Sequence, residues 1–134
     1  MALQFSTAVR NAMLDGIETA TGATAVLKIR TLAQPANCAA ADAGVALASI
    51  TLAADWASAA AAGAKSFSGL PVTDASADAT GTAAHFRLYA SDGTTCHCQG
   101  TYGTAGTDII GDSTSFTAGQ TFNVTAWTWT APGA

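Results

Sequence analysis

The sequence predicts a mainly β fold: a β-sandwich or jelly-roll-like domain with one N-terminal α-helix. Three observations indicate it: a helical apolar spacing near the start, period-two alternation in several later segments, and frequent glycine-containing turns between them. The length fits a single domain over 1–134, with the helix over about 6–21 and the β-rich body over about 24–131.

The helix is predicted to begin after Ser6, a residue type that caps helix N-termini, and to end at Gly22. Gly16 inside this segment lowers helix stability by about 1 kcal/mol relative to alanine, so the helix should depend on packing or on a partner. One apolar stripe recurs at helical spacing and consists of Val9, Met13, Ile17 and Ala20.

After the helix the apolar period changes to two. Leu27 and Ile29 alternate with Lys28 and Arg30, which is typical of a strand with one dry face and one solvated face. A second strand is predicted over 45–52, after a loop that contains proline.

The segment 57–83 has the weakest pattern. The alanine run 59–62 has no large apolar side chain to anchor a helix, so it predicts a loop or a single turn. A short strand is expected around Phe67, and 74–82 suits an exposed loop. We therefore expect this segment to form a mobile or partner-contacting arm.

A hairpin follows, with strands over 85–90 and 95–102. The Asp92-Gly93 pair between them favours a type I′ turn. In the last predicted strand, 121–130, the aromatic and β-branched side chains change face partway, which indicates a bulge or a strand buried on both sides: Phe122 and Val124 share one face, and Trp127 and Trp129 the other.

Charge is sparse in this chain. It has five basic and nine acidic residues, with 49% hydrophobic residues and a net charge of −4, whereas an ordinary domain carries about 25% charged residues. The surface therefore predicts a component that sits against neighbours, including copies of itself. The acidic balance argues against nucleic-acid binding, and no apolar stretch reaches the roughly 18 residues of a membrane span. The start lacks the pattern of a secretory signal, so synthesis in a cytoplasm is expected.

No residue pattern predicts catalysis, a cofactor or a metal. Cys38, Cys96 and Cys98 are an odd number, and we expect free thiols. The spacing in 96–98 is not that of a structural zinc site. A hydrolase would need Ser113 with a histidine base, but the G-x-S-x-G elbow is missing. The chain is therefore predicted not to be an enzyme.

Five residues are candidates for partner contact. Val9, Met13 and Ile17 form the helical stripe, and Trp127 and Trp129 belong to a residue type enriched at interface hot spots. A core role is as well supported for either tryptophan, because the chain has few large side chains.

Four segments carry a resemblance to a known family. Residues 1–15 (MALQFSTAVRNAMLD), 27–30 (LKIR), 34–40 (QPANCAA) and 81–89 (GTAAHFRLY) resemble a family of short virion structural proteins of tailed bacteriophages and prophages. The similarity covers most of the chain and is weakest beyond residue 103. The family offers no catalytic residues.

The resemblance implies a capsid cement (decoration) protein on the outer capsid surface of the virion, reinforcing contacts between subunits of the major capsid protein. A tail or fibre-associated virion protein is the alternative in the same class. A small metal- or sugar-binding accessory domain is the alternative of another class. It would require Cys96, Cys98 and a histidine to converge, or an aromatic platform to face a groove.

Overall fold

The computed structural model describes residues 3–133, so the ends of the predicted domain, residues 1, 2 and 134, lie outside the described part. Within it, 37% of the chain is strand and 11% is helix, which confirms the mainly β fold with an N-terminal helix. The elements are α1 (Thr7–Thr21), β1 (Val26–Arg30), β2 (Ala46–Thr51), β3 (Ala64–Ser66), β4 (Val72–Asp74), β5 (Gly81–Thr82), β6 (His85–Tyr89), β7 (Cys96–Gly103), β8 (Ile109–Gly111), β9 (Ser115–Phe116) and β10 (Phe122–Thr130).

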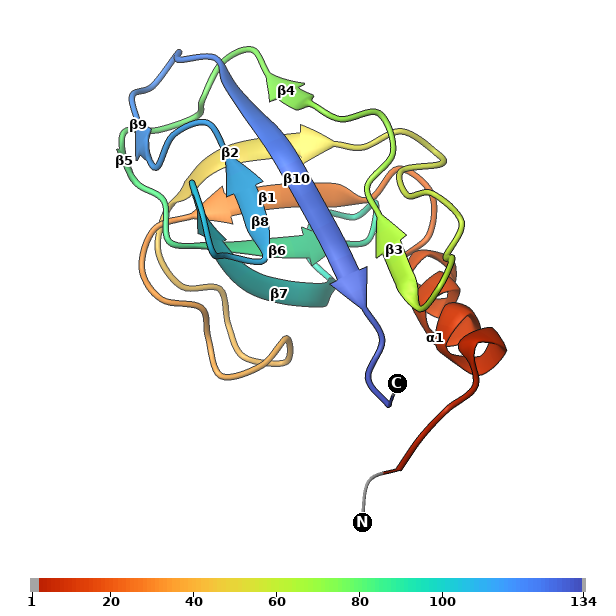
Figure 1. The fold of residues 1–134 in the computed structure, drawn as a ribbon. Helices are drawn as coiled ribbons and strands as arrows, with labels where there is room; N and C mark the ends of the chain where they lie inside the picture. The colour runs from red at the N-terminus through yellow and green to blue at the C-terminus, as the bar shows by residue number, and fades with distance from the viewer. Residues whose placement is uncertain (1–2, 134) are drawn as a thin grey trace.

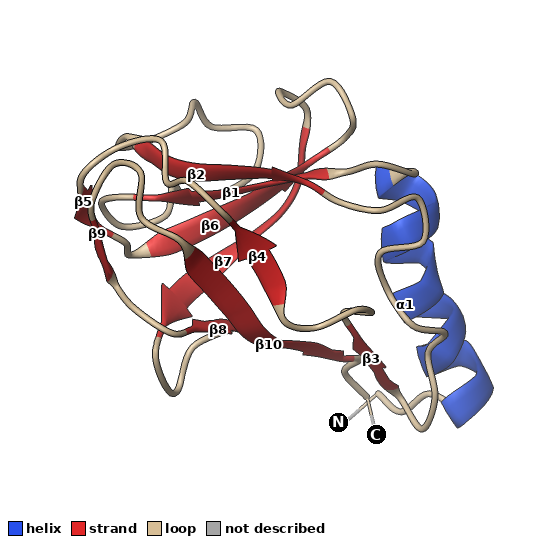
Figure 2. Cartoon of the chain, turned by 90° about the horizontal axis from the view of Figure 1, so that it is seen from above, coloured by secondary structure: helices blue, strands red, loops and turns tan. Residues whose placement is uncertain are grey.

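The strands form one curled sheet and a small ribbon. The sheet order is β2-β1-β6-β7-β8-β10-β3, with β4 also paired to β10, while β5 pairs with β9. The curl places β10 across β1 and β6, so that two layers face each other, and α1 lies at one end of them (Figures 1 and 2). The rings of Phe86 and Trp127, one from each layer, meet at 5.0 Å between centroids. The layers thus enclose a single apolar core, as expected for a sandwich-like fold.

The predicted helix caps are confirmed. The Ser6 hydroxyl accepts a hydrogen bond from the Val9 backbone N–H, and Gly22 ends α1 at a φ of 89°. Leu14 is buried and marks the side of α1 that faces the core. The predicted apolar stripe did not include this residue. Ile17 packs against the core, whereas Val9 and Met13 face away from it.

Polar side chains fasten α1 to the segment before β3. The Lys65 ammonium lies 2.9 Å from the Asp15 carboxylate and 3.0 Å from that of Glu18, and it donates to the Ser58 carbonyl. Asn11 also accepts from a backbone N–H of this segment. Because Lys65 is buried and both β3 and β4 pair with β10, the expectation of a mobile arm over 57–83 is wrong.

The hairpin of β6 and β7 is confirmed, but its turn is not type I′. Gly93 has a φ of 71°, whereas Asp92 is not among the residues with positive φ that a type I′ turn requires at both central positions. The Gly93 N–H donates to the Ala90 carbonyl, and the Asp92 carboxylate accepts from the N–H groups of Thr94 and Thr95. These contacts make a wider loop in which only glycine takes the left-handed conformation.

The predicted irregularity in the last strand is confirmed. The register of β10 against β8 shifts between Val124 and Ala126. This shift turns Trp127 to the same core that contains Phe122 and Val124.

The outer face of β1 is not solvated as predicted. Arg30 is buried beneath the loop 31–45, whose Asp42 accepts hydrogen bonds from Arg30 at 2.8 Å and from Arg87 at 2.7 Å. Tyr89 also donates to Asp42. Antiparallel pairing of β1 with β6 places Lys28 opposite Arg87. These two cations are far apart in the sequence and become neighbours only through this strand pairing.

The same loop carries a disulfide that the sequence did not indicate. Cys38 in the loop is bonded to Cys96 at the start of β7, with 5.3 Å between their Cα atoms. The expectation of free thiols is therefore wrong for these two residues, which are 58 positions apart and meet only because the loop folds back over the sheet. Among residues 3–133, Cys98 is the free thiol.

Candidate functional site

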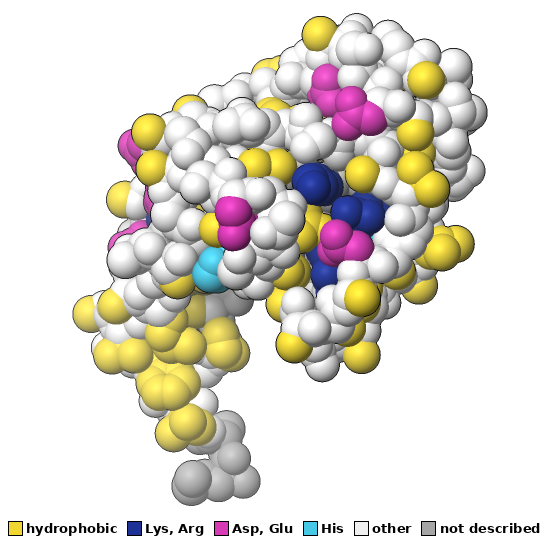
Figure 3. Space-filling view, turned by 180° about the vertical axis from the view of Figure 1, so that it is seen from behind, with side chains coloured by type: hydrophobic (Ala, Val, Ile, Leu, Met, Phe, Trp, Pro, Cys, Tyr) yellow, Lys and Arg dark blue, Asp and Glu magenta, His cyan; other side chains and the backbone are white. Residues whose placement is uncertain are grey.

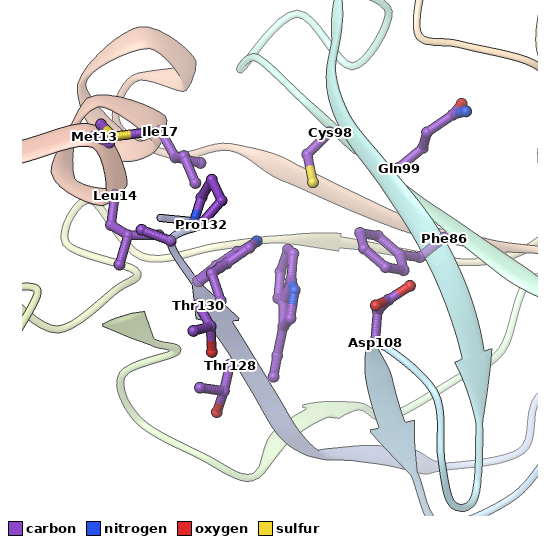
Figure 4. A pocket seen from close by; sticks show the side chains of 13 residues that line it. Met13, Leu14, Ile17, Phe86, Cys98, Gln99, Asp108, Thr128, Thr130 and Pro132 are labelled. Carbon is purple, nitrogen blue, oxygen red and sulfur yellow. The ribbon is translucent and has the colours of Figure 1, made fainter. Parts of the chain in front are cut away.

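A pocket of about 390 Å³ lies between α1, β7 and the C-terminal end of β10 (Figure 4). Four of the five predicted contact residues line it, and Val9 lies one helical turn before Met13 on α1. The lining residues are Met13, Leu14, Ile17, Phe86, Cys98, Gln99, Asp108, Trp127, Thr128, Trp129, Thr130, Ala131 and Pro132. A pocket of this size is in the range that holds one small ligand or side chain.

Trp127 forms the floor of the pocket and belongs to the core. Only 1% of it is exposed, and its ring lies 5.1 Å from that of Phe67 and 6.4 Å from that of Trp56. The prediction that Trp127 contacts a partner directly is therefore wrong.

Trp129 stays a candidate. It is partly buried, packs on Trp127 at 4.4 Å between centroids and lines the pocket. Its indole Nε1 is buried and, within the described part of the chain, has no hydrogen-bond acceptor.

The polar end of the pocket is held by β7. One oxygen of Asp108 accepts from the Thr101 backbone N–H at 2.8 Å and from its hydroxyl at 2.9 Å. A Cβ at position 100 would lie 2.7 Å from both that oxygen and the Phe86 ring. Gly100 thus lets the carboxylate approach the aromatic ring, a role that a spacing pattern in the sequence does not reveal.

The thiol in this pocket is not activated. Burial raises the pKa of Cys98. A neutral thiol is a poor nucleophile, so the geometry gives Cys98 the role of a small apolar wall residue.

The residues considered for hydrolysis do not come together. His85 is fully buried, with Nδ1 2.7 Å from the Leu32 carbonyl oxygen, and burial lowers its pKa. The Ser113 hydroxyl donates to the Ser115 carbonyl, while His97 lies on the exposed side of β7. Nothing in this arrangement supports the Ser113 hypothesis.

Between residues 3 and 133, no three side chains of His, Cys, Asp or Glu gather as a metal site would require. Cys96 is taken by the disulfide, which removes the convergence that a Cys96–Cys98–histidine site would need. No helix in the described range is long and apolar enough to cross a membrane.

Arg30, Arg87 and Asp42 form an ion-paired cluster that stabilises the fold. Figure 3, seen from behind, shows Lys and Arg side chains gathered in a hollow of the surface. Every nitrogen of the Arg87 guanidinium donates to a protein acceptor: Asp42, Gln99 or a loop carbonyl. Partial burial works to raise the pKa of Asp42, but hydrogen bonds from Tyr89 and Arg87 and the charges of both arginines outweigh it and hold the pKa below its ordinary value.

No family model, no curated protein and no solved structure matches the chain in sequence or in fold.

Proposed function

We propose that this chain is a non-enzymatic structural protein of a bacteriophage virion. Its role would be that of a capsid cement (decoration) protein, bound on the outer surface of the head and stabilising contacts between major capsid subunits. The resemblance of 1–15, 27–30, 34–40 and 81–89 to phage virion proteins supports the proposal. So does the exposed part of the apolar stripe of α1, Val9 and Met13, which no element within residues 3–133 covers fully.

The observation that carries the proposal is the exposure of Val9 and Met13, at 45% and 43%. Met13 lines the pocket together with Ile17 and Trp129, and Val9 lies one helical turn before Met13; we call these four residues the docking face. Of the charged residues of α1, Arg10 donates to the carbonyl of Ala131 at the edge of the pocket, and Asp15 contacts Lys65 outside it. An apolar surface flanked by polar groups is typical of a protein-binding site.

The physical mechanism would be binding linkage. A cement protein that binds the assembled shell better than free subunits stabilises the shell by about 2.7 kcal/mol for each site when its free concentration is 100 times Kd. No turnover is needed, and the effect grows with concentration.

Met13→Asp tests the docking face. It places a charge in an interface core, so the number of copies bound per phage head should fall steeply, because burying an unpaired charge opposes binding strongly. The copies are counted by quantitative gel analysis of heads that were purified without the chain and then incubated with it.

Val45→Asp is the matched control. Val45 is 56% exposed but lies at the loop 31–45, away from α1. It should leave binding unchanged, and circular dichroism should show both variants folded. Full occupancy by folded Met13→Asp protein would exclude the docking face as the contact.

A sugar-binding accessory domain is a second candidate, because Trp129 lines an apolar pocket as sugar-binding aromatics do. Titration with glucose, galactose and N-acetylglucosamine, followed by tryptophan fluorescence, should saturate if this candidate is right. An unchanged spectrum with all three sugars at high concentration would reject it.

A further inference from the structure

The pocket beside α1 has two chemically different ends. Figure 4 shows Met13, Leu14, Ile17 and Pro132 at one end and Asp108 beside the Phe86 ring at the other. Aliphatic walls fit a chain of methylene groups, and a carboxylate next to aromatic rings fits a cation.

The carboxylate of Asp108 forms no ion pair with a basic side chain among residues 3–133. Its hydrogen bonds come from Thr101 and occupy one of its two oxygens. The other oxygen accepts no hydrogen bond from the described residues, and Asp108 is exposed, so a donor that enters the pocket can reach it.

The five basic residues of the chain are all engaged inside the protein. Arg10 bonds to the Ala131 carbonyl, Lys28 to the Gly93 carbonyl, and Arg30, Arg87 and Lys65 to carboxylates. Hydrogen bonds to carbonyls leave the charges of Arg10 and Lys28 without a carboxylate partner among residues 3–133. With a net charge of −4, however, acidic groups outnumber basic ones over the whole chain. Charge complementarity therefore calls for a basic partner surface.

We infer that this pocket takes an arginine side chain of the protein partner, with its methylene groups between α1 and Pro132 and its guanidinium at Asp108. Arginine suits the site better than lysine because its planar guanidinium stacks on aromatic faces and pairs with a carboxylate through two donors. Trp129, which is only partly buried, supplies the aromatic face, whereas Phe86 is as buried as Trp127 and only closes the base of the pocket. The inference rests on the docking role proposed above and names the partner chemistry for it.

The probe is Nα-acetyl-arginine methylamide, and its neutral counterpart is Nα-acetyl-citrulline methylamide, which has nearly the same shape. Binding to the full chain is followed by NMR through the indole N–H signals of the tryptophans. The arginine probe should bind about threefold to fivefold more tightly than the citrulline probe, because only the former pairs with a carboxylate and ion pairs at exposed carboxylates are weak.

Asp108→Asn should remove that preference while keeping an acceptor for Thr101. Asp55→Asn, at an exposed aspartate outside the pocket, should leave the preference intact. Equal binding of both probes, an unchanged preference in Asp108→Asn, or no binding of either probe would overturn the inference. If the inference fails in one of these ways while Met13→Asp still loses binding to phage heads, the docking role stands without an arginine in this pocket.

Discussion

Removing the disulfide between Cys38 and Cys96 should destabilise the fold by several kcal/mol. The perturbation is the double variant Cys38→Ser, Cys96→Ser. The two residues are 58 positions apart, so the crosslink closes a long loop in the unfolded chain. For a loop of this length, the chain-entropy relation gives a loss of about 14 cal/mol/K, or about 4 kcal/mol at 25 °C.

The folded state should survive this change. Arg87 still donates to the carbonyls of Asn37 and Ala40 and to Asp42, so the loop 31–45 keeps its attachments to the sheet. The effect therefore acts mainly on the unfolded state. Because natural domains are stable by about 5–15 kcal/mol, a loss of 4 kcal/mol is easily measured and leaves most of them folded.

Urea unfolding followed by tryptophan fluorescence measures the difference. The midpoint should fall, and the dependence of unfolding free energy on urea should become steeper, because the unfolded chain without the crosslink exposes more surface. Cys98→Ser is the control and should stay within about 1 kcal/mol of the parent, since that thiol is only partly buried. A double variant as stable as the parent would show that the disulfide does not stabilise the fold. A mass spectrum of the oxidised protein with three free thiols would show that the disulfide does not form.

Three further predictions concern the helix, acid stability and self-association. Leu14→Ala should lower the free energy of unfolding by about 2–5 kcal/mol, whereas Met13→Ala should change it by less than about 0.5 kcal/mol; equal losses in thermal unfolding would contradict the assigned faces of α1. Burial lowers the pKa of His85, so the unfolded state gains protons first and stability should decline as the pH falls below about 6.5. The pKa of Asp42 is held low against the opposing effect of burial, so stability from its ion pairs is present above about pH 4 and is lost below it; a urea midpoint constant from pH 7 to pH 3 would contradict both assignments. The exposed Val9 and Met13 should drive dimers or larger assemblies at micromolar concentration, whereas a monomeric mass in light scattering at high concentration would count against a surface built for contact.

Local rules predicted the elements that depend on neighbours in the chain. The Ser6 cap, the hairpin around Gly93 and the irregularity before Trp127 each follow from a few consecutive residues, and the structure has all three. The type of hairpin turn was wrong because the Asp92 side chain bonds to the backbone and selects a wider loop.

Features that depend on distant segments could not be predicted. The burial of Arg30 requires the loop that carries Asp42, and the disulfide requires the same loop to reach β7. The site shows the same limit. The sequence indicated Met13 and Trp129 separately, but Asp108 reaches the pocket only through β7, where Gly100 leaves room for its carboxylate. Periodicity reports which face of one element is apolar, and it does not report what covers that face.

The most direct test of the central claim is a density map of an intact phage particle that contains this chain. We expect density for the fold on the outer surface of the head, with Val9 and Met13 of α1 against the major capsid protein. We also expect the pocket at Trp129 to face that protein. Density in the tail or fibre, or on the head with α1 turned toward solvent, would contradict the claim.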